Sequence, residues 1–127
     1  MDQLFSLIEE HGLHLIECAG PTPGGFDPRS RTIRISPGMS ERTARSVLAH
    51  ELAHAVLGHV PADDAAARDR QEVRADEWAA QLLIAPAAYA SAEAARGPHA
   101  PSIAFDLGVT VELVFAFRRL LERDRAA

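Results

Sequence analysis

The chain has 127 residues, which suits a single domain over residues 1–127 with a modest core. Its formal net charge of −5 argues against direct nucleic-acid binding, and its lone Cys18 excludes an internal disulfide. It has no run of about twenty apolar residues and no basic leader, so we expect a cytoplasmic protein without a membrane span.

The first third of the chain is expected to hold one helix and then short strands. Apolar residues gather on one side of residues 2–10, which predicts a helix. Residues 13–18 alternate as a strand, and residues 31–36 alternate as a second strand whose arginines face solvent. The Gly- and Pro-rich stretch between them turns the chain and has room for a short strand at residues 25–27.

The next predicted helix carries the residues on which the functional prediction depends. Ser40 suits an N-cap and Gly58 a helix stop, and apolar residues recur between them at three-to-four spacing. Within this helix, His50-Glu51-Leu52-Ala53-His54 matches the HExxH pattern of zinc peptidases. Positions four apart share one helix face, so both imidazoles can reach one metal ion. Glu51 follows His50 directly, so its side chain is rotated about 100° around the helix axis. This places its carboxylate beside the metal and not on it, which suits a general base.

A catalytic zinc site usually has three protein ligands and an open position, so one ligand must come from elsewhere. Residues 63–85 read as a second helix, in which Glu72 and Asp76 lie four apart on one face. We expect Glu72 to be the third ligand and Asp76 to accept a hydrogen bond from a ligating histidine. Two alternatives are that Glu72 pairs with Arg68 at the surface, or that Glu77 is the ligand; Glu77 is expected to face solvent.

Together these two segments resemble the ImmA/IrrE family of small metallopeptidases. The likeness begins at residues 32–36, continues through the HExxH segment, and resumes at residues 72–83, which resemble the family's Glu-x-x-Ala-Asn/Asp-x-Phe-Ala segment. The resemblance implies that the glutamate of this segment is the third zinc ligand. We therefore expect an α+β fold with a small antiparallel sheet packed on a helical bundle. Residues 31–36 are the expected edge strand that binds an extended peptide; the alternative is an interior strand that only packs.

Three further side chains have chemistry that suits a place near the metal. His59 lies at or past the helix end and is expected in a loop or beside a ligand, not on the metal. Tyr89 is a candidate for stabilising a tetrahedral oxyanion, with a half-buried ring of no catalytic role as the alternative. His99, in a segment rich in Gly and Pro, is a second candidate for a contribution to catalysis.

Residues 96–127 are expected to form a helical end of the same domain that resembles a helix-turn-helix. Ala104, Gly108 and Val114 have the spacing of that motif, and Thr110 suits the cap of its second helix. This helix starts without a set of polar base-reading residues, so direct DNA contact is not expected. Its arginines are expected to complement the helix dipole at the far end.

The sequence thus predicts a zinc-dependent endopeptidase in which His50, His54 and Glu72 hold Zn²⁺ and Glu51 transfers the proton. The family resemblance implies that the substrate is a helix-turn-helix repressor encoded nearby, cleaved in stress response or mobile-element induction. The alternative is a non-catalytic, zinc-stabilised regulator or toxin-like protein that binds a protein or DNA partner through its C-terminal helices. A site closed by a fourth protein ligand favours this alternative.

Overall fold

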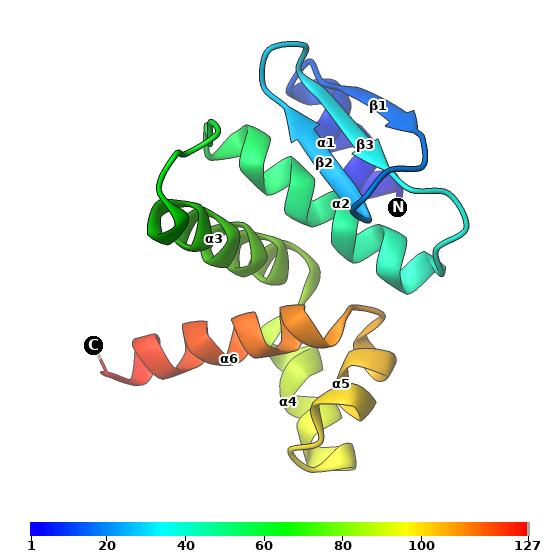
Figure 1. Ribbon diagram of the computed structural model, residues 1–127. Helices are drawn as coiled ribbons and strands as arrows, with labels where there is room; N and C mark the ends of the chain where they lie inside the picture. Colours follow the sequence, from blue (N-terminus) through cyan, green and yellow to red (C-terminus); the bar gives the residue numbers. More distant parts are fainter. Residues whose placement is uncertain (127) are drawn as a thin grey trace.

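The computed structural model describes residues 1–126, which form an α+β fold as predicted (Figure 1). The elements are, in chain order, α1 (Asp2–Glu10), β1 (His14–Glu17), β2 (Gly24–Asp27), β3 (Thr32–Ile35), α2 (Glu41–Val56), α3 (Ala65–Leu83), α4 (Pro86–Arg96), α5 (Ala100–Leu107) and α6 (Val111–Ala126). The sheet and α1 contact α2, α3 packs on α2, and α6 packs on α3 (Figure 1). The helix α2 therefore lies between the sheet and the remaining helices.

The sheet has the strand order β1-β3-β2, with β3 parallel to β1 and antiparallel to β2. Two predictions were wrong here: the sheet is mixed, not antiparallel, and residues 31–36 form its centre, not its edge. Residues 18–23 carry the chain from β1 past the position of β3, so β2 forms the opposite edge. Ile33 is fully buried, but Arg34 does not simply face solvent, because its guanidinium donates to the carbonyl oxygens of Cys18 (2.9 Å) and Thr22 (2.7 Å).

The helix α2 begins and ends where its sequence indicates. The Oγ atom of Ser40 accepts a hydrogen bond from the backbone N–H of Thr43 at 3.2 Å, which satisfies one free donor at the helix start. Gly58 follows the last turn with φ of 70°, a left-handed conformation that favours glycine. Leu48 and Leu52 are fully buried, and they fix the rotation of α2 about its axis.

The helix α3 is rich in small buried residues. Its N-cap Asp64 accepts a hydrogen bond from the N–H of Ala66, and the side chains of Ala75, Ala79 and Ala80 are fully buried. Small side chains at a helix interface let the backbones approach closely. These alanines lie three or four residues from Glu72 or Asp76 and so share their face of α3, and this face contacts α2.

Glu77 joins α3 to α6, and the prediction that it faces solvent was wrong. The residue is 4% exposed, and its carboxylate accepts hydrogen bonds from Arg119 Nε (3.1 Å) and from Arg123 Nη1 (3.0 Å) and Nη2 (2.7 Å). These two arginines therefore form ion pairs across the helix interface instead of only complementing the dipole of α6.

The turn between α5 and α6 is bonded to the N-terminal half of α2. Gly108 lies at this turn with φ of 67°, and Arg45 Nη1 donates to its carbonyl oxygen at 2.8 Å. The backbone N–H of Thr110 donates to Ser46 Oγ at 3.0 Å. No single helix within residues 1–126 is long and apolar enough to cross a membrane; α5 and α6 pass that test only as a pair, bent by 102°.

Candidate metal centre

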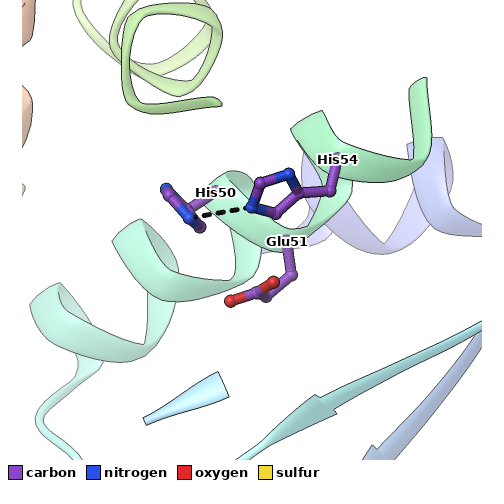
Figure 2. A group of neighbouring side chains, drawn as sticks. All are labelled: His50, Glu51 and His54. Atoms are coloured by element: carbon purple, nitrogen blue, oxygen red, sulfur yellow. Dashed lines mark hydrogen bonds between the residues drawn. The ribbon is translucent and has the colours of Figure 1, made fainter. Parts of the chain in front are cut away.

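Two histidines of α2 meet on the face of the helix that is turned toward α3. The Nε2 atoms of His50 and His54 lie 3.2 Å apart, and their rings are nearly perpendicular, at 85°. Their side chains are 18% and 12% exposed, so both rings are mostly shielded from solvent. Figure 2 shows the two rings close together and the carboxylate of Glu51 on a different side of the helix.

Glu72 comes to these histidines from α3. Its Oε2 atom lies 2.6 Å from Nε2 of His50 and 3.4 Å from Nε2 of His54. The Glu72 side chain is 59% exposed, so the cluster of His50, His54 and Glu72 is open to solvent on the side where Glu72 lies. Arg68 does not pair with Glu72; its guanidinium donates instead to the carbonyl oxygens of residues 62 and 63. Two ring nitrogens and one carboxylate oxygen therefore converge on one point at the α2–α3 interface.

Each histidine has a partner on its other ring nitrogen. Nδ1 of His50 lies 2.7 Å from Oδ1 of Asp76, and Nδ1 of His54 lies 2.9 Å from Nδ1 of His59. A carboxylate can only accept a hydrogen bond, so the proton of a neutral His50 belongs on Nδ1. This leaves the lone pair of Nε2 directed toward the point of convergence, which is the tautomer that a metal ligand needs.

Glu51 lies under the sheet, beside a glycine that the sequence analysis did not single out. The residue is 8% exposed. A Cβ atom placed on Gly24 of β2 would stand 3.1 Å from Oε2 of Glu51 and 2.6 Å from Cγ1 of Val47. The strand can approach α2 this closely because residue 24 has no side chain. The Gly24-Gly25 pair was the sequence signal for this contact, since glycine in a strand often marks close approach of another group.

Burial and neighbouring charges shift the pKa values of this group. Burial raises the pKa of Glu51 to about 7; His50 opposes this shift and Glu72 adds to it. Burial disfavours protonation of His50, but the hydrogen bond and charge of Asp76 outweigh it and raise the pKa of His50 to about 9. The pKa of His54 is lowered by burial and by the charge of His50. Strongly shifted pKa values that arise from burial and neighbouring charges are common at functional sites.

A cleft of about 650 Å³ opens over these side chains. Strand β2 forms one wall, and α2, α3 and the start of α6 form the others; the lining includes Gly24, Gly25, Phe26, His50, Glu51, His54, Glu72, Asp76, Thr110 and Leu113. Because β2 is an edge strand, an extended chain in this cleft could pair with its outer side.

The structure does not bring Tyr89 or His99 to the cleft. Tyr89 is 4% exposed between α4 and α6, where its hydroxyl donates to Glu93 (2.8 Å) and accepts from Arg118 (2.9 Å). His99 is the N-cap of α5, and its Nδ1 accepts from the N–H of Ser102. Neither residue lines the cleft, so the predicted catalytic roles of these two side chains do not hold.

The donor set fits a divalent metal ion such as zinc. Two imidazole nitrogens and one carboxylate oxygen are among the ligand sets of catalytic zinc sites. A second set of three is also compact, because ligand atoms of His50, Glu51 and His54 all lie within 4.8 Å of one another. Glu72 is the stronger candidate for the third ligand, since its Oε2 atom contacts the Nε2 atoms of both histidines.

Comparison with known proteins gives one family match. The family model Peptidase_M78, described as the IrrE N-terminal-like domain, matches residues 8–117. The matched range covers β2, α2 and α3 and so includes the whole candidate centre. A comparison with curated proteins gives no match.

Proposed function

The chain belongs to the Peptidase_M78 family of IrrE N-terminal-like domains, and on this premise we propose that it is a zinc-dependent endopeptidase. The family resemblance predicted from the two motifs is confirmed, and the family supports a metallopeptidase role. The observation that carries the proposal is the convergence of His50, His54 and Glu72, with a buried carboxylate, that of Glu51, beside them.

His50, His54 and Glu72 are the proposed zinc ligands, and three protein ligands are the number that catalytic zinc sites use. Asp76 holds the ring of His50 in the orientation that binding requires. When bound, the ion lowers the pKa of a water molecule and polarises the carbonyl of the scissile bond. The exposed side of Glu72 faces the cleft, where a peptide can enter.

Glu51 is the proposed general base. It is one residue on from His50, so its carboxylate lies beside the ligand set, under β2, where Figure 2 shows it apart from the two rings. Glu51 accepts the proton of the attacking water and passes it to the leaving amine. Its burial keeps bulk water away from the carboxylate during this transfer.

The proposed substrate is a protein segment in extended form, bound along the free edge of β2. Backbone pairing at a strand edge is independent of side chains, and β2, which forms one wall of the cleft, has such a free edge. A finer proposal comes from the family resemblance alone: the substrate is a helix-turn-helix repressor encoded nearby, cleaved in stress response or mobile-element induction.

The alternative of a non-catalytic, zinc-stabilised regulator receives less support. It calls for a fourth protein ligand that closes the site. One candidate is His59, whose Nδ1 contacts Nδ1 of His54 and so lies behind that ring, away from its Nε2. His99 lies outside the cleft. The arrangement of side chains thus favours an open site.

The test is cleavage of a peptide library, and of any helix-turn-helix repressor found to be encoded nearby, by zinc-loaded protein. We expect Glu51→Gln to keep its zinc and lose about 100-fold or more in rate, because a general base contributes about 10²–10⁴-fold. Glu41→Gln, which removes an exposed carboxylate at the start of the same helix, is the matched control and keeps full activity. Cleavage by Glu51→Gln at the wild-type rate would exclude Glu51 as the base.

A further inference from the structure

We infer that His59 is a positioning residue that fixes the tautomer and orientation of His54 for metal binding. This inference rests on the proposed function, in which His54 is a zinc ligand. The two Nδ1 atoms lie 2.9 Å apart, and the rings are tilted by 60° at a centroid distance of 5.2 Å. His59 follows the end of α2, five residues after the side chain that it contacts.

The contact is a product of the way in which α2 ends. The backbone N–H of His59 donates to the carbonyl oxygen of His54 at 3.0 Å. The backbone N–H of Gly58 donates to the carbonyl oxygen of Ala55 at 3.2 Å. Together with the positive φ of Gly58, this pair of bonds is a Schellman motif. In that motif the second residue after the helix cap folds back beside a residue in the last turn. Here both positions are histidines, so the helix stop itself brings His59 to His54.

Proton placement follows from the surroundings of the two rings. Nε2 of His54 faces Nε2 of His50 and Oε2 of Glu72, so a metal ligand at this position needs a free lone pair on Nε2. The proton of a neutral His54 then sits on Nδ1 and is donated to Nδ1 of His59. His59 must accept at Nδ1 and therefore carries its own proton on Nε2.

The two ligands are thus held by different acceptors. Asp76 on α3 supports His50 through a carboxylate, and His59 supports His54 through a neutral ring nitrogen. Partners of this kind keep a ligating ring from rotating, and their loss typically costs about 10–100-fold in metal affinity. His59 is partly buried, and its own position is fixed by the backbone bond to residue 54. We assign it to the metal centre although it binds no metal itself.

The first test needs no metal. Nitrogen-15 NMR of the histidine side chains in the metal-free protein distinguishes the two tautomers of His54. We expect the Nδ1–H form in the wild type and a shift toward Nε2–H in His59→Leu, because leucine accepts no hydrogen bond. A wild-type His54 in the Nε2–H form would overturn the inference.

The second test is zinc affinity, measured by competition with a chromophoric chelator, with the visible spectrum of the cobalt-substituted protein as a second readout. We expect His59→Leu to bind zinc about 10–100-fold more weakly. His59→Gln should recover most of this loss, because its amide oxygen can accept from Nδ1. His14→Gln, at an exposed position on β1, is the control for histidine loss and keeps wild-type affinity.

The outcomes separate the two proposals. Equal zinc affinity and an unchanged cobalt spectrum in His59→Leu contradict the role of His59 and leave the ligand set intact. A wild-type protein that binds no zinc contradicts the proposed function and, with it, the role of His59 toward a metal. Urea unfolding of each metal-free variant separates a local effect from loss of the fold, and His59→Gln remains informative if His59→Leu does not fold.

Discussion

Replacing Glu77 by glutamine tests how α6 is held against α3. The carboxylate of Glu77 is buried and accepts three hydrogen bonds, one from Arg119 and two from Arg123, at 2.7–3.1 Å. Glutamine has nearly the same size and retains one acceptor oxygen, but it has no charge. The substitution therefore removes the ion pairs with almost no change in packing.

The magnitude follows from the exposure of the three groups. Loss of one partner from a fully buried ion pair costs about 3–5 kcal/mol, because the other charge is left without water. Here the side chains of Arg119 and Arg123 are 40% and 58% exposed, so both guanidinium groups regain water when the carboxylate is lost. We therefore expect Glu77→Gln to lower the free energy of unfolding by about 1–2 kcal/mol, near the lower end of the about 1.5–3 kcal/mol that hydrogen bonds to charged groups contribute.

The effect should depend on pH. The hydrogen bonds and charges of the two arginines lower the pKa of Glu77 below its ordinary value of 4.5. A carboxyl group with a lowered pKa contributes stability that is fully present above its unfolded pKa and is lost as the pH falls through its folded pKa. The difference between wild type and Glu77→Gln should therefore be constant above about pH 6 and shrink as the pH falls below about 4.5.

Urea unfolding of the metal-free protein at several pH values measures this difference; urea is preferred because guanidinium chloride is a salt and screens ion pairs. Glu122→Gln removes the same charge from an exposed position on α6, and its cost should lie within about 0.5 kcal/mol. The reasoning is refuted if Glu77→Gln costs no more than Glu122→Gln, or if its cost persists undiminished at pH 3.

Two further substitutions test the surroundings of the cleft. Gly24→Ala should cost about 1–3 kcal/mol in urea unfolding, because the added methyl group meets Val47 at 2.6 Å, whereas Gly25→Ala, with no atom nearer than 4.0 Å, should be close to neutral. Equal costs at the two glycines would argue against close contact of β2 with α2. Asp76→Ala should weaken zinc binding by about 10–100-fold in chelator competition, with Asp76→Asn between it and wild type; unchanged affinity in both would show that Asp76 does not support His50.

Local patterns in the sequence were sufficient to predict the helices that carry the centre. The predicted first helix has the observed bounds of α1, and Ser40 and Gly58 mark the ends of α2 because capping depends on residues close in sequence. Helical spacing also placed His50 and His54 on one face. It placed Glu72 and Asp76 on one face of α3, and the structure brings these two faces together.

The errors concern contacts between residues far apart in sequence. Alternation along residues 31–36 shows which side chains share a face, but strand order depends on the connections, so the central place of β3 was not predictable from it. Glu77 was assigned to solvent because its partners lie 42 and 46 residues further on, in a helix whose packing no local pattern reveals. Tyr89 has the chemistry of an oxyanion donor, but its ring is buried against Phe117 of α6, away from the cleft.

Zinc affinity of two glutamate variants tests whether the metal is held as proposed, because Glu72 and Glu51 are the two candidates for the third ligand. We expect that wild-type protein binds one zinc ion per chain, that Glu51→Gln binds it equally well, and that Glu72→Gln binds it far more weakly. Tight binding by Glu72→Gln together with loss of binding by Glu51→Gln would contradict the account, since it would make Glu51 a ligand and leave the proposed peptidase without its base.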